Sequence, residues 1–139
     1  DVATATSITL AADTISVINY TGAAAATCTL PAATAGTVVV YAQAVDTTGG
    51  TAVLTFDAAG SDVWATGSVI ESRGSSEVTF DTSAAGETKL TFTPANATTN
   101  LLTVGGQIAF ICYETGTWHI ATSLARETTQ VTGVFAFAA

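Results

Sequence analysis

Hydrophobic and polar residues alternate in short runs along most of the chain, and turn residues separate these runs. Runs of this kind occupy residues 7–10, 14–20, 27–30, 37–45, 51–56, 68–72, 77–80, 88–93, 107–113, 117–121 and 130–139. A period of two with turns about every eight to twelve residues is typical of all-β domains. The sequence therefore predicts one domain over residues 1–139, a β-sandwich or a jelly-roll-like barrel of short antiparallel strands.

Two β-hairpins are predicted within this pattern. In residues 36–56, two apolar runs flank Asp46 to Gly50, and the Gly49-Gly50 pair supplies the positive φ that a short reversal needs. The first of these runs is apolar on both faces, with Val38 and Val40 on one and Val39 and Tyr41 on the other. We expect it at the centre of a sheet with both faces covered. The second hairpin joins residues 107–113 to 117–121 through Glu114-Thr115-Gly116.

Composition and charge argue against several classes of function. Only 10% of the residues are charged, against an ordinary value of about 25%, and the net charge is −8 with three cations, Arg73, Lys89 and Arg126. Binding of nucleic acid is not expected, because neutralising phosphates requires clustered Lys and Arg. Binding to anionic membranes is disfavoured for the same reason, and no apolar run approaches the roughly 20 residues that span a bilayer. The weakly polar surface makes assembly with neighbouring subunits a reasonable expectation.

The residues that carry reaction chemistry form no catalytic or metal-binding pattern. Cys28 and Cys112 each lie in an apolar run, and the favoured interpretation is two reduced, buried thiols, although a disulfide stays open. His119 alternates with Trp118, which indicates a solvated strand histidine. Asp57 and Asp62 bracket a turn that could hold calcium, but the loop lacks the ligand spacing of an EF-hand. We therefore predict no enzyme activity, no cofactor and no metal.

Aromatic side chains and glycosylation patterns leave further alternatives open. Trp64, Trp118, Tyr20, Tyr41 and Tyr113 could stack on sugars, although most of them are expected in the core. Two acceptor patterns for N-glycosylation begin at Asn19 and Asn96, and they carry meaning only in a eukaryotic secretory setting.

Several features follow one another along the chain. They are the step Thr29-Leu30-Pro31-Ala32-Ala33-Thr34-Ala35-Gly36 into a β-rich run, the predicted hairpin with Gly49-Gly50, the pair Gly105-Gly106, and the late run Thr115-Gly116-Thr117-Trp118-His119-Ile120. In this order they resemble the small β-structured virion proteins of tailed bacteriophages, most of all capsid decoration (cement) proteins. The resemblance implies a non-enzymatic subunit, commonly a homotrimer, on the outer capsid surface of the virion. Its partners would be the major capsid protein and copies of itself.

We expect the apolar ends of the chain, residues 1–10 and 130–139, to serve as arms that contact partners. The residues predicted to make these contacts are Val2, Ile8, Leu10, Val131, Phe135 and Phe137. The C-terminal run could instead close the chain's own sheet. Two alternative functions are a secreted pilin or surface-fibre subunit, which would donate its first residues as a strand, and a carbohydrate-binding module.

Overall fold

The computed structural model describes residues 2–3, 6–45, 47, 52–73, 78–93, 104–126 and 135–139, and every regular element among them is a strand. The strands are β1 (Val2–Ala3), β2 (Ser7–Thr9), β3 (Thr14–Ile18), β4 (Ala26–Thr29), β5 (Val38–Gln43), β6 (Leu54–Asp57), β7 (Val63–Trp64), β8 (Val69–Arg73), β9 (Val78–Thr82), β10 (Lys89–Phe92), β11 (Gln107–Glu114), β12 (Thr117–Arg126) and β13 (Phe135–Ala138). The predicted all-β class is confirmed.

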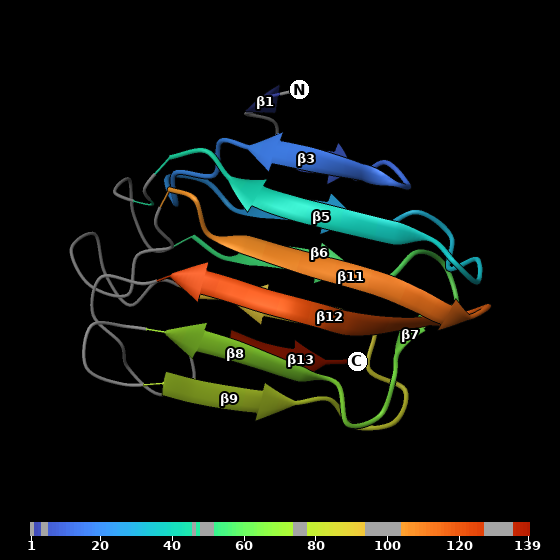
Figure 1. Ribbon diagram of the computed structural model, residues 1–139. Coiled ribbons are helices and arrows are strands. Elements are labelled where there is room, and N and C mark those ends of the chain that lie inside the picture. Colours follow the sequence, from blue (N-terminus) through green and yellow to red (C-terminus); the bar gives the residue numbers. More distant parts are fainter. Residues whose placement is uncertain are drawn as a thin grey trace.

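Two sheets face each other (Figure 1). The larger sheet has eight strands in the order β1-β3-β5-β11-β12-β8-β9, with β7 paired to β12, and the smaller sheet has five in the order β13-β10-β6-β4-β2. The described strands form a sandwich and no closed barrel. The sheets are mixed. Antiparallel pairs, as predicted, join β10 to β6 and β13, β11 to β5 and β12, and β8 to β9. Parallel pairs join β3 to β1 and β5, β4 to β2 and β6, and β12 to β7 and β8.

The core lies between the sheets and is built from the alternate side chains of each strand. Cys28, Leu54, Phe56, Leu90 and Phe92 point inward from the smaller sheet, and Val39, Tyr41, Ile108, Phe110, Cys112 and Trp118 point inward from the larger. Aromatic rings meet across the gap, as where the Phe56 and Phe110 centroids lie 5.3 Å apart. This period of two explains why these residues form strands, since each strand buries one face.

One predicted hairpin exists and the other does not. Strands β11 and β12 pair antiparallel around Thr115 and Gly116, and Gly116 takes the positive φ of 89° that the reversal requires. The predicted hairpin over residues 36–56 was wrong. Strand β5 lies at the interior of the larger sheet between β3 and β11, whereas β6 lies in the smaller sheet between β4 and β10. The chain therefore crosses from one sheet to the other between these two runs.

The two lateral sides of the sandwich differ. On one side β13 and β9 contact each other, and the Asp81 carboxylate accepts a hydrogen bond of 2.8 Å from the Phe137 backbone N–H. On the other side β2 ends the smaller sheet, and β3 is covered only by the two residues of β1, which pair with Val17 and Ile18. One side is thus bridged by a hydrogen bond, while on the other side β2 and most of β3 have no further strand beside them among the residues that the structure describes.

Candidate interaction surfaces

The outward side of the larger sheet carries aliphatic side chains in register across three adjacent strands. The register places Ile15 beside Val40 and Val40 beside Ala109, and it places Val38 beside Ile111. We define the apolar face as the outward side chains of β3, β5 and β11 that are aliphatic, namely Ile15, Val17, Val38, Val40, Ala42, Ala109 and Ile111. Six of them are half-buried, and Ile15 is 64% exposed. None is ionisable.

The apolar face overturns one expectation from the sequence. Both faces of β5 are apolar, as predicted, but only the inward face with Val39 and Tyr41 is covered by the smaller sheet. Within the described part of the chain, no element packs on the outward face with Val38, Val40 and Ala42. An aliphatic sheet surface in contact with water is a typical site of protein association.

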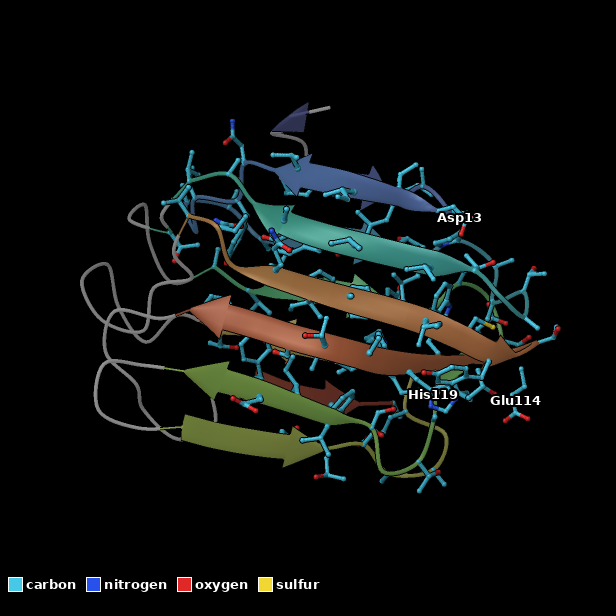
Figure 2. The ribbon with its side chains drawn as sticks, in the orientation of Figure 1. Asp13, Glu114 and His119 are labelled. Carbon is cyan, nitrogen blue, oxygen red and sulfur yellow. The ribbon has the colours of Figure 1, made fainter. Side chains whose placement is uncertain are left out.

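Polar groups lie at one end of this sheet. Figure 2 shows Asp13 at the turn before β3 and, apart from it, Glu114 and His119 at the β11–β12 hairpin, all three at that end. Asp13, in the left-handed region at φ 55°, accepts a hydrogen bond of 3.1 Å from the Val38 N–H through its carboxylate and so fixes the turn into β3. Tyr113 is 67% exposed, and its ring meets that of His119 edge to face at 4.9 Å. An aromatic and acidic rim thus borders the apolar face.

The outward side of the smaller sheet has a different chemistry. Its strands place Thr27, Thr55 and Thr91 side by side in one row, and Thr9 beside Thr29 in the next row. We call this surface the threonine face. Asp57 and Lys89 continue its second row, opposite each other on β6 and β10. Hydroxyl and charged groups hydrogen-bond to water, so this surface is suited to solvent.

A groove runs along the free edges on the open side of the sandwich. It has a volume of about 430 Å³ and is lined by Ile8, Thr9, Ala11, Thr14, Ile15, Ser16 and Ile18. Three isoleucines supply its apolar surface, and no lining residue is ionisable. We refer to it as the edge groove.

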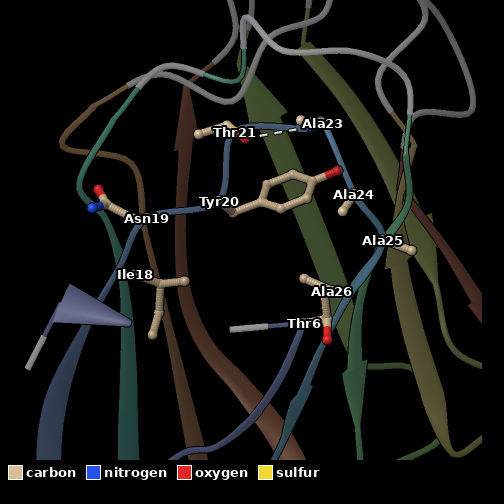
Figure 3. Close-up of a pocket in the computed structure, with 9 residues that line it drawn as sticks. All are labelled: Thr6, Ile18, Asn19, Tyr20, Thr21, Ala23, Ala24, Ala25 and Ala26. Atoms are coloured by element: carbon tan, nitrogen blue, oxygen red, sulfur yellow. Dashed lines mark hydrogen bonds between the residues drawn. The ribbon is translucent and has the colours of Figure 1, made fainter. Parts of the chain in front are cut away.

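A smaller pocket of about 90 Å³ lies beside it and shares Ile18 (Figure 3). Its lining combines the Tyr20 side chain with Thr6, Asn19, Thr21 and the methyl groups of residues 23–26. The Tyr20 hydroxyl is already used, because it donates to the Ala52 carbonyl, and the Gln43 side-chain amide donates to the Tyr20 carbonyl at 2.6 Å. Burial raises the pKa of Tyr20 to about 12, so it stays protonated at neutral pH. These bonds fix the pocket wall and use the hydroxyl proton and the carbonyl oxygen of Tyr20.

The sequence-predicted contact residues fall into three groups. Leu10, Phe135 and Phe137 are buried in the chain's own core, and β13 pairs with β10, so the C-terminal run closes a sheet. Ile8 is half-buried and lines the edge groove. Val2 belongs to β1, but its side chain lies outside what the structure describes, and Val131 lies outside the described residues. The two predicted arms contribute strands to opposite lateral sides of the sandwich.

The residues considered above for a disulfide or for metal binding have structural roles. Cys28 and Cys112 are free thiols, each fully buried, and burial raises the pKa of Cys28 to about 12. Asp62 accepts a hydrogen bond of 2.7 Å from the Ala33 N–H. Among the described residues, no group of three or more His, Cys, Asp or Glu side chains is placed to hold a metal ion. The described part of the chain also contains no helix that could cross a membrane.

The aromatic residues are mostly core, as expected. Trp64, Trp118, Tyr20 and Tyr41 are at most 3% exposed, so their faces cannot stack on a sugar. Only Tyr113 of these five is on the surface. Asn19 is half-buried beside the small pocket, and Asn96 lies outside the described residues.

Comparisons of the chain with known protein families, curated proteins and solved structures found no relative.

The chemical difference between the two outward faces was not predicted, although the alternation of residues that marks each face is present in the sequence. The threonines that alternate with Cys28, Phe56 and Leu90 mark the hydrated side of three strands. The aliphatic residues that alternate with Val39, Tyr41, Phe110 and Cys112 mark the apolar side of two others. What the sequence could not supply was the strand order that brings like rows together.

Proposed function

We propose that this protein is a non-enzymatic structural subunit of a virion, a capsid decoration protein of a tailed bacteriophage. The observation that carries the proposal is the difference between its two outward faces. The larger sheet presents the uncharged apolar face, and the smaller sheet presents the threonine face. A subunit that lies on a shell needs one surface for its neighbours and another for water.

The apolar face is the surface that would bind the shell. Its side chains sit on three adjacent paired strands, of which β5 and β11 are interior to the sheet, so they are held rigidly and lose little freedom on binding. Removing such side chains from water stabilises a contact by about 25 cal/mol per Å² of apolar area, before the cost of association. The rim with Tyr113 adds the aromatic residue type that interfaces favour.

The threonine face would then point away from the shell. Its rows of hydroxyl groups keep an outer surface hydrated even though only 10% of the residues are charged. In the proposal the partners are the major capsid protein and further copies of this chain, on the outer surface of the capsid.

A pair of matched variants tests the proposal. Val40 and Thr55 are both half-buried, both outward-facing and both on interior strands of their sheets. We expect Val40→Asp to abolish binding, because a carboxylate buried without a partner costs several kcal/mol, or more than about a hundredfold in affinity. Thr55→Asp places the same charge on the threonine face and should bind as the unmodified protein does.

The binding assay uses capsids of the virus whose genome encodes the chain, produced without this protein. Purified protein is added, the capsids are sedimented, and the bound protein is quantified. Circular dichroism and thermal melts of both variants control for folding. Equal binding by folded Val40→Asp would move the contact off the apolar face, and failure of the unmodified protein to bind any such capsid would overturn the proposed function.

A further inference from the structure

We propose that the edge groove binds an extended segment of a different protein by β-strand addition, with uncharged apolar side chains at alternate positions of that segment. The proposal goes beyond the proposed function and concerns the open side of the sandwich, which shares only Ile15 with the apolar face. It starts from the backbone groups that border the groove.

The hydrogen bonds of β2 show which groups are free. The Thr6 carbonyl accepts from the Thr27 N–H, and the Leu10 N–H donates to the Thr29 carbonyl. Along a strand, alternate residues direct their N–H and C=O groups to the same side. The N–H and C=O groups of Ser7 and Thr9 therefore point away from β4, toward the open edge.

Strand β3 presents the same arrangement on the other wall. The Ile18 carbonyl accepts from the Ala44 N–H, so Ile18 directs its backbone groups toward β5. By alternation Ile15 directs its backbone groups to the opposite side, where β1 covers only Val17 and Ile18. Among the described residues, the groove is thus bordered by the backbone donors and acceptors of Ser7 and Thr9 on β2 and of Ile15 on β3, and the side chains of Ile8, Ile15 and Ile18 contribute to its lining.

This combination selects an extended strand as the occupant. Only an extended backbone repeats donors and acceptors at the spacing of a sheet edge, and its alternate side chains enter the groove, as in other cases of strand addition. The lining combines three isoleucines and Ala11 with the hydroxyl groups of Thr9, Thr14 and Ser16, and it contains no ionisable group. On a chain of net charge −8 such a lining disfavours charged side chains, and the isoleucines favour apolar ones. The chain's own β13, which adds to β10 through Phe135 and Phe137, shows the same mode at the opposite side.

A second copy of this chain is the less suitable occupant. If two copies associated edge to edge, the edge groove of each, about 430 Å³ in volume, would face that of the other. The interface would then enclose unfilled space, which close-packed proteins avoid. An inserted strand fills the groove instead.

The test uses a library of random linear peptides displayed on filamentous phage, selected on the immobilised full chain. Enriched peptides should show apolar residues at alternate positions. Their affinity is then measured for Thr9→Pro and Thr9→Val. Proline removes only an N–H that faces the open edge, which edge strands tolerate, whereas valine keeps that N–H and removes the hydroxyl.

We expect Thr9→Pro to weaken peptide binding roughly tenfold or more, and Thr9→Val to leave it unchanged. Ala11→Trp, at an exposed position that lines the groove, provides a second variant in case the proline variant does not fold, and it should also block binding. The proposal is overturned by enrichment of no peptide, by peptides without alternation, or by equal binding to the folded variants. It is also overturned if the unmodified chain dimerises and Thr9→Pro makes it monomeric, because the occupant is then a second copy.

The two proposals can fail separately. Thr9→Pro leaves the apolar face intact, and Val40→Asp leaves the groove lining intact. Loss of capsid binding in one variant and of peptide binding in the other would therefore assign each surface its own partner.

Discussion

Three buried side chains, those of Cys28, Tyr20 and Tyr41, make the stability of the fold depend on pH in the alkaline range. Burial raises the pKa of Cys28 from 9.0 to about 12 and that of Tyr20 from 10.0 to about 12, and it raises the pKa of Tyr41 well above its ordinary value. The folded chain therefore holds these protons when the unfolded chain has already lost them. Under those conditions unfolding releases protons, so stability falls as the pH rises.

The alkaline loss of stability should be measurable through Cys28. Between about pH 9 and about pH 12 its thiol should contribute a loss of about 1.4 kcal/mol of unfolding free energy per pH unit. The contribution is fully present below the unfolded pKa of the thiol and disappears as the pH passes through the folded value. We expect Cys28→Ala, although less stable at neutral pH because of the cavity it leaves, to lose less stability between about pH 8 and about pH 11. Urea denaturation at both pH values measures this difference, and an equal loss in both proteins would show that Cys28 does not titrate as described.

At the scale of strands, alternation in the sequence predicted where most strands lie but not which strands pair. Residues 107–121 form the predicted hairpin because only two residues separate β11 from β12, which leaves the chain no other partner within reach. Residues 36–56 have the same alternation, yet a longer connection lets the second run join the opposite sheet. The edge groove could not be predicted either, since it follows from which strands are left at the edges.

The hydrogen bond between β9 and β13 can be tested for its contribution to stability. The Asp81 carboxylate accepts the hydrogen bond from the Phe137 N–H, and thus connects β9 of one sheet to β13 of the other. Asp81→Ala should lower the unfolding free energy by about 1–3 kcal/mol, because it leaves a partly buried N–H without its acceptor. Asp81→Asn keeps an acceptor oxygen and should lose less. Chemical denaturation of the three proteins makes the comparison, and equal stability of Asp81→Ala and the unmodified protein would show that packing alone holds β13.

At the scale of the whole molecule, the two outward faces divide the surface by chemistry. Both candidate surfaces depend on strand order, because Val40 and Ala109, or Thr27 and Thr55, become neighbours only in the folded sheets. Individual residues of both faces can be recognised in the sequence by their alternation. Leu10, Phe135 and Phe137 of the predicted terminal arms lie in the core. Long-range pairing is the information that alternation lacks.

Exchanging aliphatic and threonine side chains between the two outward faces should change the surface of the molecule without changing its core. In the first variant, Ile15, Val40 and Ile111 are changed to Thr, and in the second, Thr27, Thr55 and Thr91 are changed to Val. All six side chains point outward, so we expect both variants to fold, with thermal midpoints within a few degrees of the unmodified protein. On a hydrophobic-interaction column the first variant should elute earlier than the unmodified protein, and the second should elute later, because retention follows the exposed apolar area. Unfolding of the first variant alone would mean that the chain itself covers the apolar face, and the face would then be unavailable to a shell. Earlier elution with an intact fold would show that the aliphatic side chains of β3, β5 and β11 are exposed to water and therefore available for the contact with a shell that we propose.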